Sequence, residues 1–212
     1  MHTRSTLRTC LAVAAFAVAA FSFLSSAAWA DAAAATDSRW SFRTRAFVSG
    51  ESFDSEPANF KAYSGIALEA ALRRALGPRW AAEFSLHTES RELDHLNGAA
   101  PADRLGSLEM LPATIAVLYR TAGNGKVHPY GGVGVNFTVA WEKSGVVDSL
   151  DVSPSLGPAV QLGVDTDLAP NVLLNFDLRW NRLRTELKNH GVRYTKLDID
   201  PVTLGGGIGF RF

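Results

Sequence analysis

The chain has 212 residues, which suits one domain or at most two, and its 21 basic residues balance its 21 acidic ones. This balance provides no basic surface for a nucleic-acid partner, so nucleic-acid binding is not expected. The 12 Phe, 5 Trp and 4 Tyr residues exclude a disordered chain, because they are ample for a packed or lipid-facing surface. The longest apolar run lies at the N-terminus, which excludes a bundle of transmembrane helices.

Residues 1–30 have the pattern of a secretory signal peptide. Two arginines precede an apolar run over residues 11–24, and Ala28-Trp29-Ala30 offers small residues at the two positions that a signal peptidase reads. We therefore expect export and cleavage after Ala30. The only cysteine falls within this segment, so the mature chain is expected to contain no disulfide and no thiol chemistry.

The rest of the chain alternates strictly between apolar and other residues in eight segments. These segments are residues 40–48, 66–72, 80–88, 111–119, 133–141, 156–164, 172–180 and 204–212. One face of every segment is free of charge, and the other face carries Arg43, Arg45, Glu69, Glu83, Asp177, Arg179 and Arg211. A period of two residues indicates β-strands, and tilted strands of about 9–11 residues can cross a bilayer.

Two architectures place an apolar strand face differently. A soluble sandwich turns it inward, whereas an outer-membrane barrel turns it toward lipid and lines its lumen with the other face. Glycines on the charged face, aromatic residues near the strand ends, and short connections that alternate with long polar ones all favour the barrel. The long connections, expected to be loops, are residues 50–61, 89–106, 142–153 and 188–196.

We therefore predict an all-β fold, an eight-stranded antiparallel transmembrane β-barrel in the outer membrane of a Gram-negative cell. The predicted organisation is a signal peptide over 1–30, a periplasmic tail over 31–38 and the barrel over 39–212. The expected partners are outer-membrane lipids. Phe210 and Phe212 resemble the C-terminal signal by which the barrel-assembly machinery recognises its substrates, which makes that machinery a second expected partner.

Four stretches of sequence resemble the OmpW/AlkL outer-membrane family. They are WSFRTRA at 40–46, LPAT at 111–114, HPYGGVGVNFT at 128–138, similar to the family's RPYxGxGxNYT, and LDIDP at 197–201. The resemblance implies a narrow eight-stranded barrel through which small hydrophobic or amphipathic molecules pass, with no cofactor. Family members carry an apolar constriction that includes a leucine and a tryptophan, and the corresponding positions here are Ser85 and Arg179.

The candidate permeation residues follow from that departure. Glu83, Ser85, His87, Asp177 and Arg179 share the inward faces of the third and seventh segments. We expect Arg179 to pair with Asp177 or Glu83, or to meet water, because burying an unpaired guanidinium group is unfavourable. The lumen charges could act as a selectivity lining or as ion pairs that plug the barrel. Asp177→Asn is expected to leave folding largely intact.

Catalysis and metal binding are not expected. Ser85, His87 and Glu89 share one strand face, but residues two apart on a strand lie about 7 Å from each other, which is long for a serine–histidine contact. The histidines are scattered without metal-ligand spacing. Two alternatives to a channel stay open: a non-conducting structural or adhesive barrel that acts through its extracellular loops, and a lipid-modifying barrel enzyme.

Overall fold

The structure is a computed structural model that describes residues 39–50, 53–56, 60–64, 66–97, 100–121, 125–145, 151–189 and 192–212. The predicted signal peptide and periplasmic tail lie outside these residues. Within the described residues, no helix is long and apolar enough to span a membrane.

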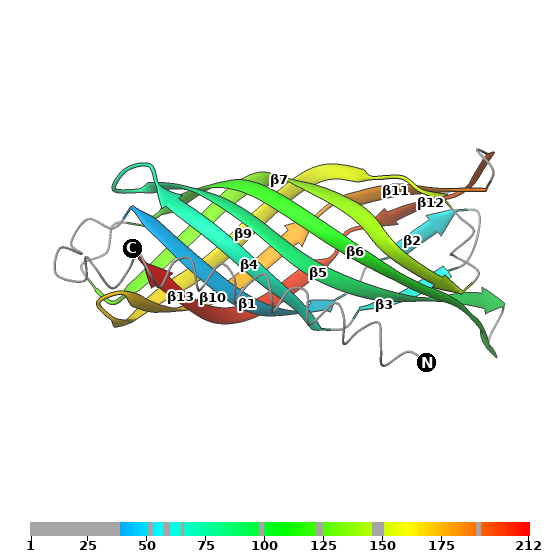
Figure 1. Cartoon of the computed structure of the whole chain (residues 1–212), viewed down its shortest axis with the longest axis horizontal. Coiled ribbons are helices and arrows are strands. Elements are labelled where there is room, and N and C mark those ends of the chain that lie inside the picture. The colour runs from blue at the N-terminus through cyan, green and yellow to red at the C-terminus, as the bar shows by residue number, and fades with distance from the viewer. Residues whose placement is uncertain are drawn as a thin grey trace.

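Eight antiparallel strands form a closed barrel (Figure 1). They are β1 (Trp40–Gly50), β4 (Ile66–Ala75), β5 (Trp80–Asn97), β6 (Ala100–Arg120), β7 (Val127–Gly145), β9 (Ser155–Ala169), β10 (Val172–Asn181) and β13 (Val202–Arg211). Around the barrel the order is β5-β4-β1-β13-β10-β9-β7-β6, and pairing of β5 with β6 closes it. Closure leaves no open edge in lipid, where backbone groups without partners would be costly. The predicted eight-stranded barrel is confirmed.

Five shorter strands extend the barrel at one end, where the sequence predicted loops. They are β2 (Phe53–Glu56), β3 (Phe60–Ser64), β8 (Asp151–Val152), β11 (Leu183–Asn189) and β12 (Val192–Ile199). Strand β3 pairs with the outer part of β5, and a second sheet has the order β2-β12-β11-β8. The loop prediction was wrong here, because backbone pairing continues beyond the apolar band and needs no apolar face once both sides of a hairpin meet water.

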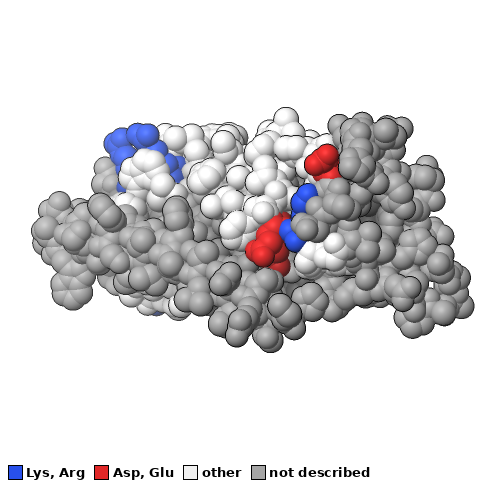
Figure 2. Space-filling view, turned by 45° about the vertical axis from the view of Figure 1, so that its right-hand side comes forward, with Lys and Arg blue, Asp and Glu red and all other residues white. Residues whose placement is uncertain are grey.

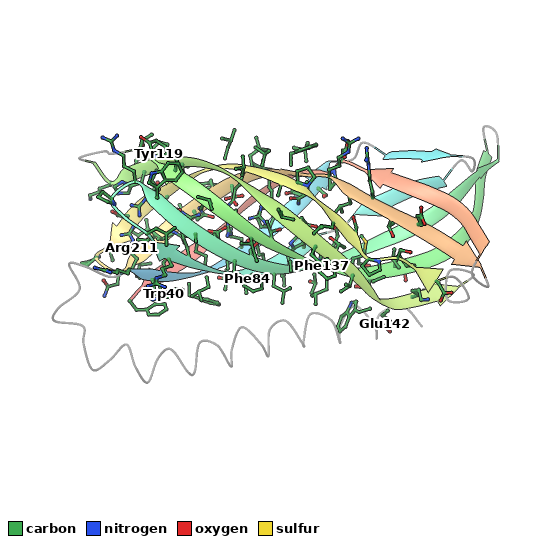
Figure 3. All side chains as sticks on the ribbon, turned by 90° about the horizontal axis from the view of Figure 1, so that it is seen from above. Trp40, Phe84, Tyr119, Phe137, Glu142 and Arg211 are labelled. Carbon is green, nitrogen blue, oxygen red and sulfur yellow. The ribbon has the colours of Figure 1, made fainter. Side chains whose placement is uncertain are left out.

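The outward face of the barrel is apolar along the middle of each strand. Val133, Val135 and Ile115 are 65%, 51% and 64% exposed, and Figure 2 shows a broad uncharged area between the basic side chains at one end and the charged side chains farther along the molecule. Phe84 and Phe137 point away from the barrel in Figure 3. An exposed apolar band of this kind is suited to lipid contact. The alternation therefore has the phase that the sequence predicted.

Strand closure depends on a close approach of β13 to β1. A Cβ atom on Gly207 would lie 1.8 Å from the carbonyl oxygen of Thr44, so only glycine fits there. At the end of the same seam, Trp40 and Phe212 exchange two backbone hydrogen bonds of 3.2 and 3.0 Å. This end also carries the short turns, which marks it as the periplasmic end, and the extended strands lie at the extracellular end.

Candidate functional site in the barrel lumen

The lumen is crossed by a group of charged side chains, called here the lumen network. It comprises the cations of Arg43, Arg45, Arg73 and Arg179 and the carboxylates of Glu69, Glu83, Asp165 and Asp177. Each of these residues is at most 3% exposed. The network holds four cations and four carboxylates, so its formal charges cancel. Alternation places every member inward, because each lies on the strand face opposite the lipid-facing residues.

Arg45 on β1 is the centre of the lumen network. Its Nε atom lies 2.8 Å from Glu69 Oε1, its Nη2 atom 2.7 Å from Glu83 Oε1 and its Nη1 atom 2.9 Å from Asp177 Oδ2. These three carboxylates come from β4, β5 and β10, so one guanidinium group ties together strands on several sides of the barrel. Its side chain is fully buried, which makes these ion pairs dependent on one another.

Toward the periplasmic end, Asp165 joins two further arginines. Its Oδ2 atom lies 2.9 Å from Arg43 Nη2 and 3.0 Å from Arg73 Nη1. Arg73 also binds Glu83 through Nε at 2.7 Å, and its guanidinium carbon lies 4.2 Å from the centre of the Tyr130 ring. The lumen network therefore continues from the middle of the barrel toward its periplasmic mouth.

Uncharged polar side chains complete the hydrogen bonding of the carboxylates. Gln161 Nε2 donates to Asp177 at 2.7 Å and to Glu83 at 3.0 Å, and Asn175 Nδ2 donates to Asp165 at 2.7 Å. The hydroxyl of Tyr130 donates to Asp177. Because buried carboxylates are stable only when paired and hydrogen-bonded, these contacts hold the network in one arrangement.

Arg179 reaches across the barrel from β10 to the opposite wall. Its Nη1 atom lies 2.5 Å from Glu69 Oε2 on β4 and donates at 3.4 Å to Ser85 Oγ on β5. Strands β5 and β10 are four places apart in both directions around eight strands, so they face each other. The Arg179 side chain and the ion pairs it forms therefore fill the lumen at this level. The interior of an eight-stranded barrel is narrow enough for side chains to fill it.

A cavity of about 10 Å³, enough for about one water molecule, lies on the extracellular side of Arg179. Its lining is Phe47, Ser49, Ala67, His87, Glu89, Arg179 and Thr203. The guanidinium carbon of Arg179 lies 5.3 Å from the centre of the Phe47 ring, which gives the cavity a cationic floor against an aromatic wall. The lumen above the network is therefore amphipathic, in contrast to the part below it, which is filled by charged and polar side chains.

The β5–β6 ladder is interrupted at the level of this cavity. Pairing runs to Leu86 with Ala113 and resumes in the same register at Glu89 with Met110, so the ladder is interrupted over the two positions between. The residue of β6 at the position facing His87 is Pro112, which has no N–H to donate. The β5–β6 ladder is longer overall than the β1–β13 ladder, but it is locally interrupted at this level, whereas β1–β13 pairing is continuous.

The structure places all five sequence-predicted permeation residues inside the barrel. Glu83, Asp177 and Arg179 belong to the lumen network, Ser85 contacts Arg179, and His87 lines the cavity. Their role in permeation stays a prediction. Both carboxylates expected as partners of Arg179 lie within ion-pair distance of it, but a third carboxylate is nearer.

Glu69 is the nearest carboxylate, whereas Asp177 and Glu83 lie 3.7 and 3.8 Å from Arg179 Nη2. Asp177 also has a larger structural role than expected. It accepts from Arg45, Gln161 and Tyr130 and is 1% exposed, so the expectation that Asp177→Asn leaves folding intact no longer holds.

Some residues in and around the lumen network were not predicted from the sequence. Arg73 and Asp165 each lie one residue beyond the predicted ends of their strands, and continuing the same alternation by one residue would have placed both inside. Tyr130, Gln161 and Asn175 carry no charge, and nothing in their spacing distinguished them. Arg211, predicted to face the lumen, lies at the periplasmic mouth, where its Nη2 atom is 2.5 Å from Asp167 Oδ1.

The two assembly-signal residues lie on the outward side at the end of the chain. Phe210 and Phe212 are 39% and 37% exposed, and their role in assembly stays a prediction. In the described part of the chain, no group of three or more His, Cys, Asp or Glu side chains is arranged to hold a metal ion.

Comparison with known proteins places the chain in a family. A family model described as "OmpW family" matches residues 47–212. The "Uncharacterized outer-membrane protein y4mB" of Sinorhizobium fredii (strain NBRC 101917 / NGR234) is 35% identical over 115 residues, 51% of this chain and 50% of that protein. The "Dibenzothiophene metabolism operon protein PahQ" of Pseudomonas aeruginosa is 28% identical over 119 residues, 54% of this chain and 56% of that protein.

The chain thus spans about half the length of the curated relatives it matches. In fold it is similar to the crystal structure of the outer membrane protein OprG from Pseudomonas aeruginosa, with a TM-score of 0.66 and 24% identity over 82% of this chain and 95% of that one. The barrel, its outer-membrane relatives and the match over most of its length agree: the chain belongs to the OmpW family of outer-membrane proteins.

Proposed function

We propose that this barrel takes small hydrophobic or amphipathic molecules passively from the cell exterior into its lumen and releases them sideways into the membrane. The observation that carries the proposal is the coincidence of the lumenal cavity with the interrupted β5–β6 ladder, since His87 belongs to both. The family resemblance supports the class of solute. The name of one relative, a dibenzothiophene metabolism operon protein, also associates that protein with an apolar compound.

The lumen network argues against a straight path to the periplasm. A solute moving below Arg179 would have to separate buried ion pairs of 2.5–3.0 Å, and breaking one buried pair costs about 3–5 kcal/mol. Several such pairs lie in series between the cavity and the periplasmic mouth. An apolar solute could not offset their loss, so the cavity is the end of the axial path.

The side of the barrel offers the easier exit. Opening a seam in lipid exposes backbone groups, and this cost falls where ladder bonds are already missing. The interruption beside His87 lies at the level of the cavity, and Leu86 and Leu111 give the outward face there an apolar surface. A hydrophobic solute that leaves there enters the hydrocarbon layer instead of water, which is the favourable direction for apolar surface.

We expect the solute to be amphipathic and to carry a hydrogen-bond acceptor, and the cavity walls must move apart to admit it because the cavity has room for only about one water molecule. The Nε and Nη2 atoms of Arg179 have no hydrogen-bond acceptor among the described residues, and Phe47 provides an apolar wall beside them. Glu69 neutralises the charge of Arg179, so we expect a preference for neutral acceptors such as alcohols and ketones. For the same reason we expect no preference for anionic solutes.

A second candidate is a non-conducting barrel that acts through its extracellular end. The closed lumen network supports it, because the same ion pairs that block axial passage would serve a purely structural barrel. Among the lumen residues that the structure describes, none is arranged to support a lipid-modifying enzyme, and the absence of catalysis stays a prediction.

Uptake of a hydrophobic fluorescent probe separates these candidates. Cells that produce the barrel should take up N-phenyl-1-naphthylamine several-fold faster than cells that produce a barrel-free control, while the purified protein should give no stable ion conductance in a planar bilayer. Equal uptake rates would reject the channel and favour the non-conducting barrel. Steady ion conductance would reject a closed periplasmic half.

A further inference from the structure

Two arginines lie on the outer surface of the barrel at its periplasmic end. Arg74, near the end of β4, and Arg79, just before β5, are both exposed. The guanidinium carbon of Arg74 lies 5.2 Å from the centre of the Trp40 ring, and Arg79 Nη1 donates a hydrogen bond of 3.3 Å to the hydroxyl of Tyr119. Contact with aromatic rings limits the freedom of both cations and keeps them at the barrel wall.

Aromatic side chains fix the depth of these arginines in the membrane. Trp40, Trp80 and Tyr119 are 37%, 52% and 40% exposed, and the Trp80 and Tyr119 rings meet edge to face at 5.1 Å. Figure 3 shows Trp40 and Tyr119 at the same end of the barrel as Arg211. Tryptophan and tyrosine concentrate at membrane–water interfaces, so Arg74 and Arg79 lie at the headgroup level of the inner leaflet.

The strand register places a small side chain between the two arginine–aromatic pairs. Arg74 is opposite Ala82, and Ala82 is opposite Val117. Trp80, two residues before Ala82 on the same face of β5, is a diagonal neighbour of Arg74, a relation that typically spans about 7–8 Å. Because Ala82 is small, the surface between Arg74 and Trp80 is not filled by a side chain of β5.

Charge around these two arginines is of one sign. The outward-facing residues of segments 40–48, 66–74, 80–88 and 111–119 include no carboxylate. Figure 2 shows basic side chains gathered at one end of the face in view, with no acidic side chain beside them among the described residues. The opposite seam at the same end carries Lys126 in a turn and the apolar Leu168. A localised cationic surface at headgroup level attracts negative charge.

We propose that this surface, the rim patch formed by Trp40, Arg74, Arg79, Trp80 and Tyr119, binds an anionic phospholipid of the inner leaflet. The lipid phosphate accepts hydrogen bonds from the arginines that flank Trp80, since guanidinium groups form strong charge-assisted bonds with phosphate oxygens. Its glycerol region and the start of an acyl chain lie over Ala82. A zwitterionic lipid is bound less tightly, because its ammonium group is repelled by the same arginines.

Native mass spectrometry of the purified barrel tests this inference. The protein is exposed to equal amounts of phosphatidylglycerol and phosphatidylcholine with identical acyl chains, and the bound fraction of each gives their relative affinity. One arginine near a membrane surface changes lipid affinity by about fivefold, so we expect a preference for phosphatidylglycerol of about fivefold or more. Arg74→Gln with Arg79→Gln should reduce that preference to near unity, and Arg74→Lys with Arg79→Lys should keep most of it.

Lys126→Gln is the matched control, since it removes one cation at the same end of the barrel but outside the rim patch. It should leave the preference unchanged, and the altered mobility of unboiled protein in SDS reports folding for every variant. Equal binding of the two lipids by the parent protein would overturn the inference, as would an equal effect of Lys126→Gln. Release of phosphatidylglycerol by millimolar inorganic phosphate would assign the patch to a free anion and overturn it as well.

Discussion

Removal of Arg45 is the sharpest perturbation of the lumen network. Arg45→Met keeps a side chain of similar length and removes the cation that lies 2.7–2.9 Å from Glu69, Glu83 and Asp177. Three cations would then face four carboxylates in a fully buried site. Breaking a buried pair costs about 3–5 kcal/mol, and we expect the upper part of that range because three carboxylates lose a partner at once.

A second substitution shows whether this loss is electrostatic. Asp177 has Arg45 as its nearest cation, and Asp177→Asn in the Arg45→Met background restores equal numbers of opposite charges. The two substitutions are therefore expected to be non-additive, with a coupling free energy of about 1–3 kcal/mol. Each single variant should have a lower free energy of unfolding than the parent. The loss in the double variant should be smaller than the sum of the two single losses.

The assay is urea unfolding of the barrel from lipid vesicles, followed by tryptophan fluorescence. The free energy of unfolding of the four proteins in this cycle gives the coupling directly. A loss below about 1 kcal/mol for Arg45→Met would refute the reasoning, because it would mean that water already screens the network. Strict additivity of the two changes would refute it too, since the contacts would then not depend on one another.

Three further predictions concern the wall, the closure and the floor of the lumen. Val135→Arg puts a cation on the lipid-facing side and should lower the free energy of unfolding in the same vesicle assay by about 2–4 kcal/mol; an unchanged value would mean that the strand phase is wrong. Gly207→Ala should prevent formation of the SDS-resistant barrel because its Cβ would meet the Thr44 carbonyl oxygen at 1.8 Å, whereas Gly77→Ala, with nothing within 4 Å, should fold normally. Arg179→Met with Glu69→Gln keeps the network neutral and makes the cavity floor less polar, so the uptake rate of N-phenyl-1-naphthylamine should rise. A lower uptake rate would mean that Arg179 is one of the groups that bind the probe.

The barrel and the phase of its strands were predictable because the membrane imposes a strict rule on sequence. Lipid excludes charge from one face, so alternation alone separated Arg179, which is 2% exposed, from Leu178, which is 43% exposed. The same rule makes no prediction for residues outside the apolar band. There the strands of the extracellular extension pair in water, and their sequences show no one-sided apolar pattern.

The lumen was predictable only in part. Alternation identified inward-facing charges but not their partners, because partners come from strands distant in sequence. Glu69 and Arg179 are 110 residues apart, and neither spacing nor composition indicates that they meet. The choice between a selectivity lining and a plug also depends on such contacts, and the ion pairs across the lumen favour the plug in this structure.

A reversible lock across the β5–β6 seam tests the central claim most directly. Thr88→Cys with Leu111→Cys places two thiols across the gap in the ladder, in a mature chain expected to have no other cysteine. Thr44→Cys with Ile208→Cys is the matched control across the continuous β1–β13 ladder. Mass spectrometry of both variants confirms that each disulfide has formed.

The measurement is the uptake rate of N-phenyl-1-naphthylamine before and after the disulfides are reduced. Release through the β5–β6 seam predicts that oxidised Thr88→Cys with Leu111→Cys loses most of its uptake and regains it on reduction, while the control pair keeps the parent rate in both states. Undiminished uptake with the seam locked would contradict lateral release and show that the solute leaves the lumen by another path.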